Sequence, residues 1–271
     1  MTETSVASPA PPASADAPLL KVSGISKRFG GLTAVADFSV QLLPNEIIGV
    51  IGPNGAGKTT VFNLLTSVYT IDSGSIVLSG KSLTGQSPDR VTACGIARTF
   101  QNIRLFREMT VLENVKVGFE SRRSANLFST LLRQSTFRSE EHDIETKAME
   151  LLALFGLEAV ADDISRNLPY GQQRKLEIAR ALASSPRVLL LDEPAAGMNE
   201  SESEALRELL TDIRKRFNLS MLVIEHDMPF VMGLVQRLLV LDHGTIIAQG
   251  TPKEVRENPA VIEAYLGKED A

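Results

Sequence analysis

The sequence predicts a three-layer α/β core that is interrupted by a helical insertion. Two observations carry this fold class. The run Ile47–Ile51 is continuously apolar, as expected of a strand buried on both faces of a sheet, and a glycine-rich loop and a helical pattern follow it. Residues 110–185 are then mostly helical in pattern, after which strands resume at residues 188–191, 221–224 and 238–241.

The remaining elements follow from local patterns. Residues 20–26 and 34–42 have the composition of short strands, with Gly30 and Gly31 between them. Helical spacing over 59–68 follows the glycine-rich loop. A second helix is expected over 201–217, with Ser201 or Asn199 as its N-cap.

We expect one nucleotide-binding domain with two short tails. Residues 1–18 are rich in Ala, Pro and Ser and predict a disordered tail. The domain is placed at 19–267, with its helical insertion at about 103–186, and residues 268–271 form a C-terminal tail. No internal repeat is evident.

Composition excludes several classes of function. The net charge of −5 argues against a non-specific nucleic-acid binder, so no nucleic-acid partner is expected. The single cysteine, Cys94, rules out an intrachain disulfide. No apolar run approaches the roughly 20 residues of a membrane span, and the N-terminus lacks the pattern of a signal peptide. Any role at a membrane is therefore expected to come through a partner.

The motif that predicts a ligand is the loop after the apolar run, which matches G-x-x-x-x-G-K-[ST]. Glycines let successive backbone N–H groups turn towards an anion, at a helix N-terminus whose dipole also favours negative charge. We expect Lys58 to reach the β- and γ-phosphates of ATP and the Thr59 hydroxyl to hold Mg²⁺. The predicted phosphate-binding residues are Gly52, Pro53, Asn54, Gly55, Ala56, Gly57, Lys58, Thr59 and Thr60.

Two carboxylates end the next apolar run, at residues 188–191. Asp192 is suited to hold Mg²⁺, directly or through water. Side chains alternate along a strand, so Glu193 points elsewhere and could reach an attacking water. Together with the phosphate loop, this pair predicts a hydrolytic site.

The phosphate loop, the two carboxylates and the further motifs given below stand in the order typical of one family. Over residues 19–267 the chain resembles the ATP-binding subunits of ABC transporters. The resemblance implies an antiparallel β subdomain beside the P-loop core. It also gives Phe29 the place of an aromatic that stacks on adenine, and Gln101, in Phe-Gln-Asn, the place of the glutamine that touches Mg²⁺ or water. His226 takes the place of a switch histidine that contacts the γ-phosphate.

The segment at residues 168–172, Leu-Pro-Tyr-Gly-Gln, resembles the family's signature peptide and is expected to precede a helix over 173–182. In the family this peptide grips the nucleotide of the opposite subunit, a role implied here for Tyr170, Gly171 and Gln172. Pro169 stands where the family has a serine, so one donor is missing. Asn199 stands where the D-loop usually has aspartate.

The resemblance implies a dimer of ATP-binding subunits, more probable as a heterodimer than as a homodimer, bound to transmembrane permease subunits and indirectly to a solute-binding protein. The chain would then lie in the cytoplasm, peripheral on the inner face of the cell membrane. Segments such as that around Gln101 are most similar to the larger ATPase of branched-chain amino-acid importers. Related importers for urea or other amino acids stay open as alternatives.

Two alternative interpretations of the motifs would give the chain a different function. An ATPase of DNA repair or chromosome maintenance would need a long coiled coil between the phosphate loop and the signature peptide, and the chain has no room for one. A weakly hydrolysing, ATP-gated regulatory subunit is the second alternative. Glu193 and His226 argue against it, while Pro169 argues for it.

Overall fold

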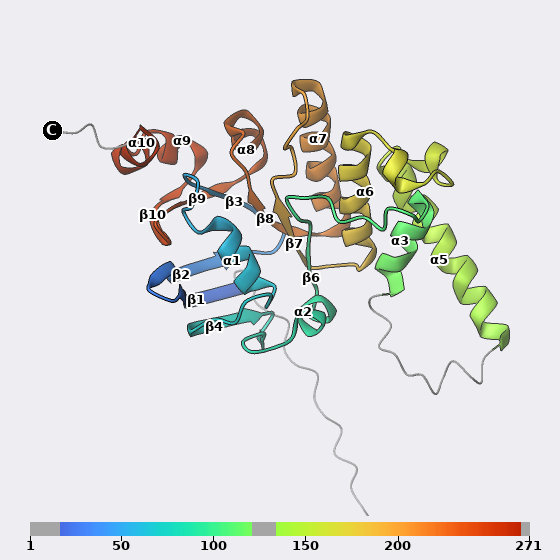
Figure 1. The fold of residues 1–271 in the computed structure, drawn as a ribbon, viewed down its shortest axis with the longest axis horizontal. Helices are drawn as coiled ribbons and strands as arrows, with labels where there is room; N and C mark the ends of the chain where they lie inside the picture. Colours follow the sequence, from blue (N-terminus) through green and yellow to red (C-terminus); the bar gives the residue numbers. More distant parts are fainter. Residues whose placement is uncertain (1–16, 121–133, 267–271) are drawn as a thin grey trace, which may run out of the picture.

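The computed structural model describes residues 17–120 and 134–266 and contains two sheets. The larger sheet has six strands in the order β10-β9-β3-β8-β7-β6, all parallel to their neighbours except β10. The smaller sheet has the order β2-β1-β4-β5 and is antiparallel. These sheets, with helices on both faces of the larger one, confirm the predicted α/β class (Figure 1).

The strands are β1 (Leu20–Phe29), β2 (Leu32–Leu42), β3 (Ile47–Ile51), β4 (Ser73–Leu78), β5 (Lys81–Ser82), β6 (Ile96–Arg98), β7 (Val188–Asp192), β8 (Ser220–Ile224), β9 (Arg237–Asp242) and β10 (Thr245–Gly250). The helices are α1 (Lys58–Leu65), α2 (Pro88–Cys94), α3 (Val111–Glu120), α5 (Gln134–Leu154), α6 (Tyr170–Ala183), α7 (Glu200–Phe217), α8 (Met228–Leu234), α9 (Pro252–Arg256) and α10 (Pro259–Leu266). Two short 3₁₀ turns, Glu158–Val160 and Ser165–Asn167, connect α5 to α6.

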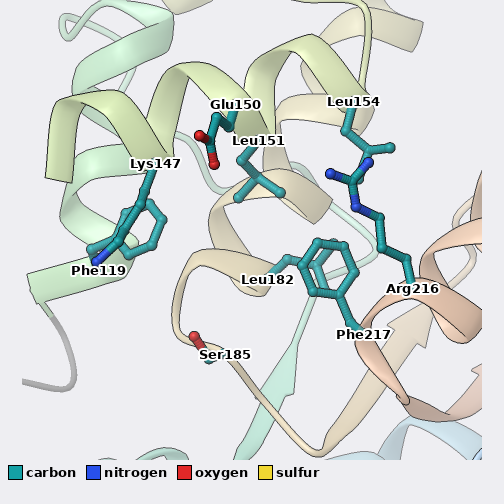
Figure 2. Close-up of a pocket in the computed structure, with 9 residues that line it drawn as sticks. All are labelled: Phe119, Lys147, Glu150, Leu151, Leu154, Leu182, Ser185, Arg216 and Phe217. Atoms are coloured by element: carbon teal, nitrogen blue, oxygen red, sulfur yellow. The ribbon is translucent and has the colours of Figure 1, made fainter. Parts of the chain in front are cut away.

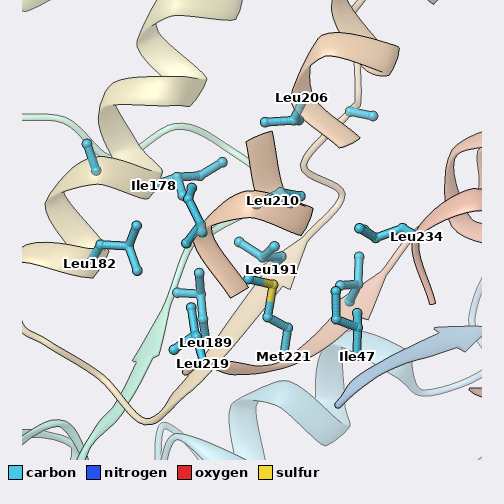
Figure 3. Packing of buried hydrophobic residues seen from close by; sticks show 14 of the residues in the cluster. Ile47, Ile178, Leu182, Leu189, Leu191, Leu206, Leu210, Leu219, Met221 and Leu234 are labelled. Carbon is cyan, nitrogen blue, oxygen red and sulfur yellow. The ribbon is translucent and has the colours of Figure 1, made fainter. Parts of the chain in front are cut away.

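The central strands are buried on both faces, as the apolar run at Ile47–Ile51 predicts for β3. Every residue of β3, β7 and β8 is buried. Along β7 the side chains alternate between two cores: Leu189 and Leu191 pack with α6 and α7, while Val188 and Leu190 face the core around α1 and the small sheet. Figure 3 shows Leu191 beside Leu210 of α7 and Leu189 near Leu219, within one group of buried apolar side chains.

Helix boundaries differ from the expected ones where caps decide them. Helix α6 begins at Tyr170, three residues before the expected start, with extended Pro169 as its N-cap, so the predicted signature peptide forms its first turn. Helix α7 begins at Glu200 because the Asn199 side chain accepts from the Glu202 backbone N–H in a capping box. Asn199, not Ser201, is therefore the cap.

The described residues include no helix long and apolar enough to cross a membrane. Of the two predicted tails, 1–18 lies outside the described residues except for 17 and 18, and all of 268–271 lies outside them.

Candidate functional site

The phosphate loop leaves the buried strand β3 and turns into α1, in a backbone path that requires glycine. Gly52 has a φ of 149°, and a Cβ there would lie 2.1 Å from the Leu241 carbonyl oxygen. Gly57, the N-cap of α1, has a φ of 100°, and its Cβ would lie 2.5 Å from the Ala34 carbonyl oxygen. Strands β9 and β2 therefore hold the loop at both ends.

Lys58 is folded back over the loop. Its Nζ donates to the carbonyl oxygens of Gly52 at 2.7 Å and Pro53 at 2.9 Å. Burial lowers the pKa of this ammonium, and the negative charges of Glu193 and Asp192 oppose the shift. The loop thus holds a cation close to the two carboxylates that end β7.

Gln101, Glu193 and His226, predicted from separate parts of the chain, meet at one point. The Gln101 Nε2 donates to Glu193 Oε2 at 3.0 Å, and His226 Nδ1 lies 3.9 Å from the same carboxylate oxygen. Glu193 has a φ of 50°, a left-handed backbone conformation that is uncommon outside glycine. Strained backbone of this kind is common at functional sites.

Asp192 ends β7 with its side chain only 2% exposed. Its Oδ2 accepts from Arg98 Nη2 at 2.7 Å, whereas its Oδ1 is buried and has no hydrogen-bond partner among the described residues. An ionised oxygen left without a partner is costly, and carboxylate oxygen is a preferred ligand of Mg²⁺. Asp192 therefore fits the metal role that the sequence predicts for it.

Sequence reasoning missed Arg98, whose role depends on tertiary packing. The guanidinium lies 5.5 Å from the ring centroid of Phe62 and 5.0 Å from that of Phe100, and its Nη1 donates to Asn63 Oδ1 at 2.6 Å. Arg98 thus joins the phosphate-loop helix α1 to Asp192. A single arginine after a short apolar strand offers no pattern from which to infer this.

Phe29 lies at the end of β1 and is 43% exposed, so it is not a core residue. Its ring meets the ring of Tyr69 edge to face, with 5.2 Å between centroids. Two exposed aromatic rings together offer a surface on which a planar base can stack. Tyr69 was not among the predicted residues.

The predicted signature residues lie on α6, which packs against α3 and α5. Tyr170 is 45% exposed, and its hydroxyl accepts from Arg174 Nη2 at 3.1 Å. Its ring lies beside Gly197, which belongs to the segment 196–199 that resembles the D-loop. A Cβ on Gly197 would lie 3.2 Å from Tyr170 Cε1. Gly171 and Gln172 follow in the first turn and are half-buried.

The C-terminal helix α10 also contacts the phosphate loop. Tyr265 of this helix is 45% exposed; its partial burial raises the pKa of the phenol, and the backbone of Gly52 opposes the shift. A cavity of about 750 Å³ lies between the two elements, lined by Pro53 to Ala56 on one side and by Ala260, Glu263 and Ala264 on the other. The loop is therefore supported from the C-terminal end of the chain.

A smaller pocket of about 190 Å³ lies between α5, the end of α6 and the end of α7 (Figure 2). It is lined by Phe119, Lys147, Glu150, Leu151, Leu154, Leu182, Ser185, Arg216 and Phe217. None of these residues belongs to the predicted site, so the candidate site remains the one around the phosphate loop and Glu193.

Comparison with known proteins gives matches along most of the chain. Residues 35–196 match the ABC transporter family model, and residues 245–271 match a model described as branched-chain amino acid ATP-binding cassette transporter. The structure is similar to that of a nucleotide-free ATP-binding cassette from an ABC transporter, with a TM-score of 0.81 and 30% identity over 93% of this chain and 100% of that one. The ADP conformation of MJ1267, an ATP-binding cassette of an ABC transporter, gives a TM-score of 0.80 and 30% identity, covering 93% of this chain and 99% of that one.

Curated relatives are similar over their whole length. The high-affinity branched-chain amino acid transport ATP-binding protein LivG of Escherichia coli K12 is 47% identical over 93% of this chain and 98% of its own. BraF of Pseudomonas aeruginosa, with the same description, is 43% identical over the same shares. The lipopolysaccharide export system ATP-binding protein LptB of Haemophilus influenzae is 32% identical, again over 93% and 98%.

Proposed function

The chain belongs to the ABC transporter family and is one of its ATP-hydrolysing subunits, and we propose that it drives the uptake of branched-chain amino acids. The meeting of Gln101 and His226 on Glu193, beside the phosphate loop, is the observation that supports hydrolysis at this site. The substrate class rests on the full-length similarity to LivG and BraF and on the C-terminal family match.

In the proposed mechanism, Glu193 orients the attacking water and accepts its proton, and the Gln101 amide holds the carboxylate in place. Lys58 leaves the two loop carbonyls to meet the β- and γ-phosphates, and His226 stabilises charge that develops on the γ-phosphate. Thr59, Asp192 and Gln101 would hold a Mg²⁺ ion, which when bound neutralises charge on the phosphate oxygens. Phe29 would stack on adenine, with Tyr69 beside it.

We further propose that a second ATP-binding subunit completes the site, and that this subunit is a different protein rather than a second copy of this chain. The signature residues Tyr170, Gly171 and Gln172 open helix α6, and they would meet the nucleotide held by that second subunit. Pro169 offers no hydroxyl for this contact. The helix dipole and the backbone N–H groups of the first turn would supply the attraction for phosphate.

The permease would bind the groove beside residues 100–104, the loop that carries Gln101 and is called the glutamine loop below. This groove has a volume of about 610 Å³, and its lining includes Phe100, Arg104, Leu105, Phe106 and Arg180. Phe106 is 46% exposed there, which suits an anchor for a permease helix. Bound to the permease, and indirectly to a solute-binding protein, the chain would lie on the cytoplasmic face of the membrane.

The test is phosphate release by the complete transporter in proteoliposomes. Leucine-loaded binding protein should stimulate hydrolysis, whereas urea should not. Glu193→Gln should retain ATP binding and lose about 10²- to 10⁴-fold in turnover, the usual contribution of a general base. Normal turnover in this variant would overturn the role of Glu193, and stimulation by urea but not by leucine would overturn the substrate class.

A further inference from the structure

A buried ion pair lies on α6 one turn beyond Tyr170. Arg174 and Glu177 have side chains that are 0% and 1% exposed, and Arg174 Nη1 lies 3.0 Å from Glu177 Oε2. Burying two charges costs several kcal/mol per ion unless hydrogen bonds satisfy their other donors and acceptors. The partners of this pair therefore indicate what holds it in place.

Those partners are backbone groups of the glutamine loop. Arg174 donates through Nη1 to the Phe100 carbonyl oxygen at 2.6 Å and through Nη2 to the Gln101 carbonyl oxygen at 2.8 Å. Glu177 Oε1 accepts from the backbone N–H groups of Phe100 at 3.4 Å and Arg104 at 3.1 Å. The arginine thus binds loop carbonyls and the glutamate binds loop amides.

This arrangement fixes a segment that has no regular secondary structure of its own. The loop is half-buried at Phe100 and exposed at Gln101 and Arg104, and the backbone groups of these three residues find their partners on α6. The planar guanidinium donates in fixed directions, so it sets the path of the chain at Phe100 and Gln101. That path in turn places the Gln101 amide 3.0 Å from Glu193 Oε2.

The same guanidinium reaches the signature peptide. Nη2, which donates to the Gln101 carbonyl, also donates to the Tyr170 hydroxyl at 3.1 Å. We propose that Arg174 and Glu177 are positioning residues for ATP hydrolysis. This proposal rests on the roles proposed above for Gln101 and Glu193. They hold the glutamine loop so that Gln101 meets Glu193, and the Tyr170 hydroxyl links this placement to the signature peptide of the same chain.

The experiment is a double-mutant cycle in the assembled transporter, with Arg174→Lys, Gln101→Ala and the pair combined. Lysine keeps the charge and loses the fork, so Arg174→Lys should lower kcat about tenfold, the effect of one or two charged hydrogen bonds on a barrier. The ATP Kd, read with a fluorescent nucleotide, should stay within about twofold because Arg174 does not touch the phosphate loop. In the Gln101→Ala background, Arg174→Lys should lower kcat by no more than about twofold.

Arg207→Lys is the matched control. Arg207 also pairs with a glutamate three residues away on one helix and donates to the Gly233 carbonyl oxygen, but its side chain is 29% exposed and that of Glu204 53%, and weakening this pair should leave kcat unchanged. Tyr170→Phe provides a cycle with little risk to folding, since it removes one hydroxyl from a half-exposed side chain. It should lower kcat about threefold in the wild type and have little effect beside Gln101→Ala.

The outcomes separate this inference from the proposed site. Suppose that Gln101→Ala lowers kcat, and that Arg174→Lys or Tyr170→Phe lowers kcat by the same factor in the Gln101→Ala background as in the wild type. The positioning role is then wrong, while the proposed site stands. If Gln101→Ala turns over like the wild type, the role of Gln101 falls and the positioning role falls with it.

Discussion

Because Arg98 and Asp192 form a buried ion pair, we expect a large loss in the free energy of unfolding when Arg98 is replaced. Both side chains are buried, 5% and 2% exposed, and Asp192 Oδ1 already lacks a partner among the described residues. Arg98→Met would keep an unbranched side chain against Phe62 and Phe100 but remove the ion-pair partner of the Asp192 carboxylate. Breaking a buried pair in this way costs about 3–5 kcal/mol.

The assay is thermal unfolding followed by circular dichroism, in EDTA and then with Mg²⁺ and ADP. At about 2–4 °C per kcal/mol for a domain somewhat smaller than this one, Arg98→Met should lower the Tm by about 10 °C in EDTA. If Asp192 takes part in holding Mg²⁺, the bound cation replaces part of the lost positive charge. The difference in Tm between variant and wild type should then narrow by several degrees with Mg²⁺ and ADP.

Arg104→Met is the control, because Arg104 stacks on Phe100 with 3.9 Å from guanidinium carbon to ring centroid, is exposed and forms no ion pair with Asp192. It should lower the Tm by no more than about 3 °C, as expected for the loss of an exposed cation–π contact. The reasoning is refuted if the two variants unfold together in EDTA. It also fails if Mg²⁺ and ADP raise the Tm of Arg98→Met no more than that of the wild type.

The remaining predictions concern the adenine surface and pH. Phe29→Ala should weaken ATP binding about tenfold and leave binding of inorganic triphosphate unchanged, because the ring would contact only the base; equal losses in a competition assay would contradict the stacking role. Glu225 directly follows β8 and is 1% exposed, and this burial raises the pKa of its carboxyl group. The native state therefore gains stability from the bound proton at low pH and loses that gain as pH rises through the raised value. In urea unfolding, wild type should therefore lose stability relative to Glu225→Gln as pH rises above about 4.5, and a growing wild-type advantage would contradict the shift.

The sequence was most informative where a pattern depends on neighbouring residues alone. The apolar run at β3 predicted a strand buried on both faces, those at β7 and β8 predicted strands, and the glycine-rich loop was expected to join β3 to a helix. Helix starts were less predictable: α6 begins at Tyr170 without a side-chain cap, and a single side chain decides the start of α7. Asn199 rather than Ser201 caps α7, since only Asn199 forms the reciprocal bonds with Glu202.

The candidate site was predictable only as a set of separate motifs. Glu193 was predicted from its place after an apolar strand and Gln101 and His226 from resemblance to a family, and their meeting could not be derived from spacing along the chain. Arg98 and Arg174 were missed for a different reason. Arginine is rarely fully buried, so composition and periodicity assign it to the surface unless the tertiary partners are known.

The left-handed backbone at Glu193 has a consequence for protein engineering. A non-glycine residue with a φ of 50° carries a conformational cost of about 1 kcal/mol or more, which glycine would avoid and asparagine would reduce. Selection for expression or heat resistance alone would therefore favour replacing Glu193 with one of these residues. Such a screen would enrich chains that fold better and have lost the group proposed to activate water, so it needs a second selection for transport.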